Sequence, residues 1–71
     1  MHNSIKVHRA MHNLTQAELA EKVSVSTWTI NSMEKNRYAP SVTLALRIAQ
    51  LFNKPVEEIF ILEADEQVKG L

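Results

Sequence analysis

The chain has 71 residues, of which 45% are hydrophobic, and it contains one glycine, two prolines and no cysteine. A chain of this length forms one small domain, and this composition is too apolar for disorder and too poor in turn formers for a many-stranded β fold. It excludes disulfides and thiolate chemistry, and no apolar run reaches the roughly 18 residues that a bilayer span requires. We therefore expect a compact all-α domain in the cytoplasm.

The net charge is zero, but the charges are distributed unevenly along the chain. Residues 1–54 carry seven basic and three acidic side chains, whereas residues 55–71 carry one basic and five acidic ones. The basic part favours a polyanionic partner, and the acidic end is expected to lie away from that partner. We place the end of the folded domain at residue 62 and treat residues 63–71 as an acidic tail.

The sequence predicts a first helix over residues 4–12 and a second over residues 16–23. The start of the second is marked by a capping box, in which the Thr15 side chain accepts from the backbone of Glu18 and the Glu18 carboxylate accepts from the backbone of Thr15. Ser26 repeats the start signal and predicts a third helix over residues 27–34. So short a connection between the second and third helices indicates a helix-turn-helix.

Ser41 caps a fourth predicted helix, which has a broad apolar face and ends at Asn53, a residue type that tolerates the left-handed conformation. Pro55 suits the start of a short fifth helix. We expect the five helices to enclose one core formed by Ile5, Leu14, Leu19, Val23, Ile30, Met33, Leu44, Ile48, Leu51, Ile59 and Phe60.

One side of the third predicted helix carries Thr27, Trp28, Asn31 and Ser32. A face that is merely solvated more often carries Lys, Glu, Gln or Arg, which have better helix propensity, so these residues favour a contact surface. Short polar side chains hydrogen-bond base edges in the major groove, and a tryptophan offers a plane for a thymine methyl. The spacing alone leaves two alternatives open, a core position for Trp28 and simple solvation of the polar residues.

From Ile5 to Phe60 the chain resembles the Cro/C1-type (XRE) family of helix-turn-helix regulators. The resemblance is carried by residues 14–20 (LTQAELA), 25–26 (VS), 29–30 (TI), 34–41 (EKNRYAPS), 44–49 (LALRIA) and 57–60 (EEIF). It implies a five-helix, lambda-repressor-like domain. It also implies a sequence-specific double-stranded DNA-binding transcriptional regulator, a repressor by expectation, that reads the major groove with the helix near residues 27–33.

The resemblance also implies roles for individual residues. The glutamine that opens the second helix in the family contacts a phosphate and braces the reading helix, a role that falls on Gln16. The base-contacting positions of the family fall on Thr27, Trp28 and Ser32, and Asn31 is expected as a further base contact. The loop after the reading helix lies against the DNA backbone, which implies phosphate contacts by Lys35, Asn36, Arg37 and Tyr38.

Arg9 and Glu34 match positions that form an ion pair in phage relatives, so we expect a structural role for Arg9, with phosphate binding as the alternative. Ser24 stands where the family usually has glycine, which predicts either mild strain in the turn or a shifted conformation. His8 stands where the first helix usually buries leucine. A lone histidine there is most often a satisfied core residue, and a pH sensor is the alternative.

Because one short reading helix covers only a few base pairs, we expect a homodimer on DNA, with residues 59–62 as its seam. In some small members of the family the two ends of the chain pair as short strands. Ile61 and Leu62 are expected either to pair in this way with residues near His2 or to begin a frayed acidic tail.

The two rival functions are those of an enzyme and of a protein-binding module. The chain shows no metal-ligand spacing, catalytic motif or glycine-rich phosphate loop, so we expect no catalytic residue, no metal and no cofactor. The stronger rival is an antitoxin-like or adaptor module that binds protein with the same fold. The neutral net charge and the lack of long polar side chains on the reading helix keep this rival open as the alternative to DNA binding.

Overall fold

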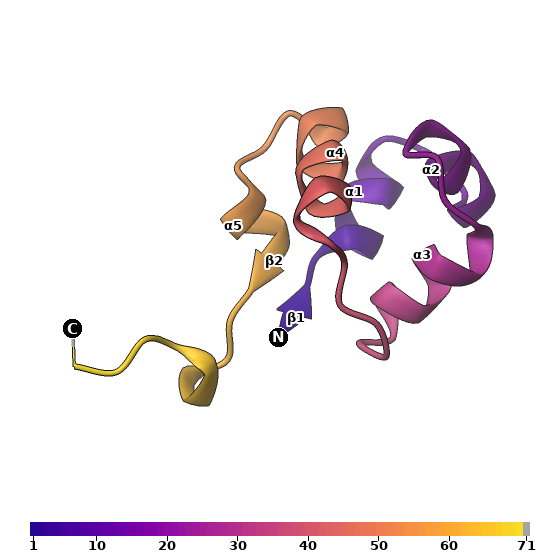
Figure 1. The fold of residues 1–71 in the computed structure, drawn as a ribbon. Coiled ribbons are helices and arrows are strands. Elements are labelled where there is room, and N and C mark those ends of the chain that lie inside the picture. The colour runs from indigo at the N-terminus through magenta and orange to yellow at the C-terminus, as the bar shows by residue number, and fades with distance from the viewer. Residues whose placement is uncertain (71) are drawn as a thin grey trace.

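Five helices surround one core in the computed structural model, which describes residues 1–70 (Figure 1). They are α1 (Ile5–Met11), α2 (Gln16–Lys22), α3 (Thr27–Glu34), α4 (Val42–Phe52) and α5 (Val56–Ile59). Strand β1 (His2–Asn3) precedes α1, and strand β2 (Phe60–Ile61) and the short 3₁₀ helix η1 (Ala64–Glu66) follow α5. The expected all-α fold is confirmed, and none of the described helices is long and apolar enough to cross a membrane.

Small polar side chains start three of the helices. Thr15 Oγ1 accepts from the Glu18 amide at 3.0 Å, and Glu18 Oε1 accepts from the Thr15 amide at 3.0 Å, which is the expected capping box. The hydrogen bonds from the backbone and side chain of Thr15 lower the pKa of Glu18. Ser26 and Ser41 cap α3 and α4, each accepting from the amide three residues on, at 3.1 and 3.2 Å. These local bonds place the helix starts where the sequence predicts them.

The core draws side chains from all five helices. The buried residues that were expected are Ile5, Leu19, Val23, Ile30, Met33, Leu44, Ile48 and Ile59. Three expected core residues are only partly buried and pack against the edge of the core: Leu14, Leu51 and Phe60. Three further residues are buried although they were not expected in the core: Ala20, Ala49 and Phe52.

His8 of α1 and His12, which follows α1, pack against the ring of Phe52. The His8 ring stacks on it at 5.5 Å between ring centroids, and the His12 ring lies 5.2 Å away in a tilted arrangement. His8 Nδ1 is buried and has no hydrogen-bond partner among the described residues. The expectation of a satisfied histidine is therefore wrong for this atom, and His8 serves as a flat ring against the core.

Among residues 1–70, four non-glycine residues adopt a left-handed backbone conformation, and three of them are asparagines. Asn53 ends α4 with φ of 55°, as expected. The fourth is Ser24, with φ of 63°, in the turn between α2 and α3. Serine has no particular tolerance for this conformation, so the turn that sets the angle between α2 and α3 is strained where glycine would be relaxed.

The segments before α1 and after α5 meet in a small antiparallel sheet, in which His2 pairs with Ile61 and Asn3 pairs with Phe60. The expected strand pairing is present, but β2 is shifted by one residue and Leu62 lies beyond it. Glu63 Oε1 then lies 2.7 Å from His2 Nδ1, so the segment after β2 folds back on the N-terminal strand instead of fraying at once.

The expected dimer seam, residues 59–62, is largely occupied within the chain. Ile59 is fully buried in the core, and Phe60 and Ile61 are half-buried in the sheet. Only Leu62, at 50% exposed, offers much free apolar surface. The expectation is therefore wrong for Ile59, which cannot contact a partner while it fills its own core.

A forked ion pair joins α1 to the end of α3. Arg9 Nε donates to Glu34 Oε2 at 2.8 Å and Arg9 Nη2 donates to Glu34 Oε1 at 3.2 Å. Arg9 Nη1 also donates to the carbonyl of Leu14 at 3.0 Å, which ties in the loop before α2. The hydrogen bonds to Glu34 raise the already high pKa of Arg9. The expected ion pair is thus present, and its partners are largely shielded from solvent, with 17% and 7% of their side chains exposed.

We predict that Arg9→Ala and Glu34→Ala each lower the free energy of unfolding by about 2–4 kcal/mol, because each leaves a shielded charge without its partner. The double variant should lose less than the sum of the two. Urea unfolding measures all three. Glu21→Ala, at an exposed position of α2, should change stability by less than about 0.5 kcal/mol. Strict additivity of the two single changes would contradict the coupling.

We also predict that Ser24→Gly stabilises the domain by about 0.5–1 kcal/mol, since relief of the left-handed strain exceeds the greater flexibility of glycine in the unfolded chain. The matched control is Ser26→Gly, at a residue with φ of −78° whose hydroxyl caps α3. That variant should lose roughly 0.3 kcal/mol. Thermal unfolding distinguishes the two signs, and a loss of stability in Ser24→Gly would refute the strain.

Candidate nucleic-acid interface

The first turn of α3 carries exposed side chains. Thr27 is exposed, and Trp28 is 68% exposed, so the alternative that Trp28 is a core residue is wrong. The Trp28 ring meets the ring of Tyr38 edge to face, with 6.5 Å between centroids and 62° between planes. A large aromatic surface is therefore held in solvent, where it is costly to expose and available to a ligand.

Ser32 differs from its expected role. It is 6% exposed and belongs to the buried side of α3 together with Ile30 and Met33. Its position on the helix follows Asn31 by only 100°, and the packing of α3 against the domain covers that angle. The expectation that Ser32 reads a base is therefore corrected, and we exclude Ser32 from the candidate interface.

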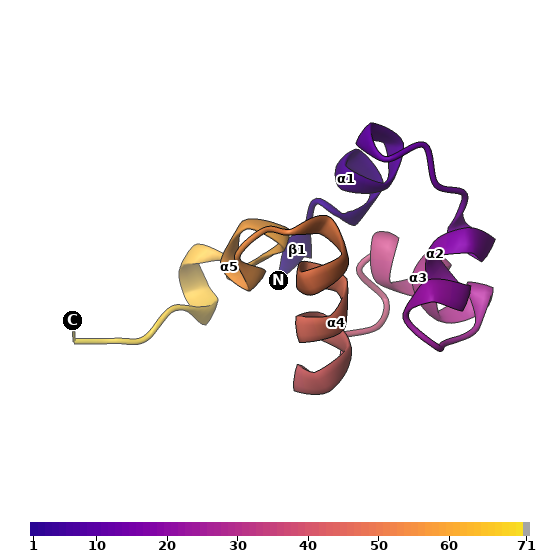
Figure 2. The same ribbon diagram turned by 90° about the horizontal axis from the view of Figure 1, so that it is seen from above.

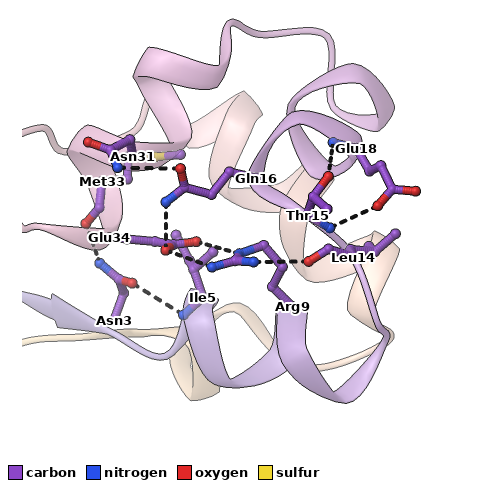
Figure 3. A network of polar contacts seen from close by, with 10 residues as sticks. All are labelled: Asn3, Ile5, Arg9, Leu14, Thr15, Gln16, Glu18, Asn31, Met33 and Glu34. Atoms are coloured by element: carbon purple, nitrogen blue, oxygen red, sulfur yellow. Dashed lines mark hydrogen bonds and ion pairs between the residues drawn. The ribbon is translucent and has the colours of Figure 1, made fainter.

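A chain of side-chain hydrogen bonds runs from α3 through the start of α2 to α1 (Figure 3). Asn31 Nδ2 donates to Gln16 Oε1 at 3.3 Å, and Gln16 Nε2 donates to Glu34 Oε1 at 3.1 Å. Glu34 is in turn held by Arg9. Each carboxamide nitrogen carries two hydrogens, so Gln16 and Asn31 each keep one N–H for a ligand, and Asn31 also keeps its Oδ1 acceptor.

The loop after α3 exposes all four residues that were expected to contact phosphate: Lys35, Asn36, Arg37 and Tyr38. Asn36 turns the chain with φ of 59°. Asn3 braces this turn, donating to the Met33 carbonyl at 2.7 Å and to Asn36 Oδ1 at 3.2 Å. Within residues 1–70, Lys35 and Arg37 form no ion pair, so both cations remain available to an anion.

Two hollows flank this loop. The larger, about 240 Å³, lies between α1, α2 and α3 and is lined by Lys6, Arg9, Gln16, Asn31, Glu34 and Lys35. Nothing in the sequence distinguishes Lys6 beyond the general basic excess of residues 1–54. The smaller hollow has a volume of about 170 Å³, and its lining includes Asn36, Tyr38 and Glu66. The acidic end therefore reaches the candidate interface, against expectation, although the chain beyond η1 projects away from α2 and α3 (Figures 1 and 2).

Known proteins have similar sequences and a similar fold. The sequence model of the helix-turn-helix family matches residues 5–59. An uncharacterized HTH-type transcriptional regulator of Methanocaldococcus jannaschii is 52% identical over 93% of this chain and 100% of its own length. Another from Archaeoglobus fulgidus is 47% identical over 93% of each chain. A third, from Bacillus subtilis, is 38% identical over 92% of this chain and 98% of its own length.

The crystal structure of a transcriptional regulator from Listeria innocua superimposes with a TM-score of 0.69 at 17% identity, over 90% of this chain and 65% of that one. At this identity the likeness concerns the fold alone. The family match covers most of the chain, and α2 and α3 supply the two helices and tight turn of the motif. The chain therefore belongs to the Cro/C1-type family of helix-turn-helix transcriptional regulators.

Proposed function

We propose that the protein binds double-stranded DNA in a sequence-specific manner and represses transcription, with α3 in the major groove. The observation that carries this proposal is the 68% exposure of Trp28 on α3, which is followed by a loop in which Lys35 and Arg37 form no ion pair within residues 1–70. An exposed indole would be a liability on a merely solvated helix. The indole suits the apolar surface of a DNA groove, and the cations of the loop suit its phosphates.

Base reading is assigned to Thr27, Trp28 and Asn31. Trp28 offers a plane for a thymine methyl, and the Tyr38 ring lies edge to face against it. Asn31 keeps an N–H and an acceptor oxygen after its bond to Gln16, which are the two groups that an asparagine uses on adenine. The bond to Gln16 holds that amide in place, so less side-chain entropy is lost on binding.

Phosphate binding is assigned to Gln16, Lys35, Asn36, Arg37 and Tyr38. The four loop residues sit on a turn that Asn3 fixes from the N-terminal strand, so their backbone is already ordered. Gln16 retains one N–H for a phosphate oxygen. These contacts set register and overall affinity, and they carry no sequence information.

One α3 helix covers only a few base pairs, so we include a homodimer in the proposal, which would read two half-sites. Two copies related by a two-fold axis would place two α3 helices about 34–36 Å apart, one helical turn of DNA. With Ile59 buried, the seam of such a dimer must use exposed side chains such as Leu62. A dimer that covers an operator blocks the same DNA to other proteins, which is the simplest route to repression.

The decisive test separates base contacts from phosphate contacts. A preferred duplex is first selected from random oligonucleotides with the wild-type protein. Trp28→Ala should then weaken binding to that duplex by about 1–3 kcal/mol and leave binding to a random duplex almost unchanged. Because Trp28 is exposed, circular dichroism should show an unchanged fold.

Arg37→Ala is the matched comparison. It should weaken binding to both duplexes to a similar degree and lower the salt dependence of log Kobs by about one. An unchanged affinity ratio in Trp28→Ala would remove Trp28 from the reading surface. A wild-type protein that binds no duplex at low salt would contradict DNA binding and favour the protein-binding alternative.

A further inference from the structure

We infer that Lys6 is a further phosphate-binding residue and that the larger hollow, between α1, α2 and α3, takes one phosphate of the DNA backbone. This inference rests on the proposed DNA binding. The hollow has a volume of about 240 Å³, and its lining comes from three helices and the residue that follows α3. Lys6 of α1 and Lys35 after α3 both line it, so two lysines far apart in the sequence share one site.

The charge of this hollow is set by these two lysines. Arg9 and Glu34 also line it, but they engage each other through two hydrogen bonds and cancel as charges. Lys6 and Lys35 are exposed and form no ion pair within the described part of the chain. The hollow therefore carries two uncompensated positive charges in a chain whose net charge is zero, and a nearby anion is attracted to it.

A neutral donor completes the site. Gln16 lines the same hollow, and its hydrogen bond to Glu34 leaves one N–H on its amide nitrogen, whereas the remaining N–H of Asn31 is assigned to a base. Two lysine ammonium groups and one positioned amide donor suit the paired terminal oxygens of a phosphodiester. The lining includes Asn31 of α3, so a phosphate bound there lies beside the proposed reading face, as the edge of a groove requires.

The test is the salt dependence of binding to a random duplex. Lys6→Ala should weaken binding roughly fivefold at low salt and lower the slope of log Kobs against log salt by about 0.9. Lys6→Arg keeps the charge and should keep the slope. The control is Lys54→Ala, which removes the same charge from an exposed lysine after α4 and outside the hollow, and which should leave the slope unchanged.

The outcomes separate this inference from the function on which it rests. If Arg37→Ala lowers the slope while Lys6→Ala behaves like Lys54→Ala, the role of Lys6 is overturned and DNA binding stands. If the wild-type protein shows no salt-dependent binding to DNA, the proposed function is overturned as well.

A second arm distinguishes a DNA phosphate from a free one. Amide NMR shifts are recorded while inorganic phosphate replaces chloride at constant ionic strength. If Lys6→Ala abolishes phosphate-induced shifts around Gln16 but leaves the DNA slope unchanged, the hollow is a site for free phosphate and the inference is wrong. Weak phosphate shifts together with the expected loss of slope support it.

Discussion

The arrangement of the candidate interface depends on the forked ion pair between Arg9 and Glu34. It locks α1 to the end of α3 and, through the Leu14 carbonyl, holds the loop that leads into α2. Gln16 donates to the same carboxylate, and Asn31 in turn donates to the Gln16 side-chain oxygen. Arg9 also cancels the charge of Glu34. Glu34 can therefore order the surface that we propose to contact phosphate without repelling that phosphate. The pair contributes more to geometry than to stability, because desolvation offsets much of its attraction.

One side of α3 packs against the core, and its first turn is exposed to solvent. Ile30, Ser32 and Met33 are buried and fix the helix to the domain, whereas Thr27 and Trp28 are exposed in its first turn. Exposed β-branched and aromatic residues are poor choices for helix stability. The turn before α3 is strained at Ser24, and His8 Nδ1 is buried without a hydrogen-bond partner among residues 1–70, so the domain carries two local costs besides its exposed tryptophan. Such costs are expected where binding constrains the sequence.

Local signals in the sequence predicted the helix starts well, because a cap involves residues only three apart, as between Thr15 and Glu18. The Arg9–Glu34 pair followed from resemblance, since its partners lie 25 residues apart and no local rule joins them. Ser32 was misplaced because helical spacing orders residues around an axis but does not show how wide the buried sector is. Lys6 was missed because the hollow exists only when three helices meet. Burial of Phe52 and the one-residue shift of β2 likewise depend on tertiary packing, which the sequence pattern does not specify.

The most direct test of the account uses Trp28, which is the only tryptophan of the chain and is exposed at the start of α3. Its fluorescence reports this one position without labelling. Acrylamide should quench it efficiently in the free protein and much less in the complex with the selected duplex, because α3 in the major groove covers the indole. Equal quenching in the free protein and at saturating DNA would show that Trp28 stays in solvent, and it would contradict the central claim that this face of α3 reads DNA.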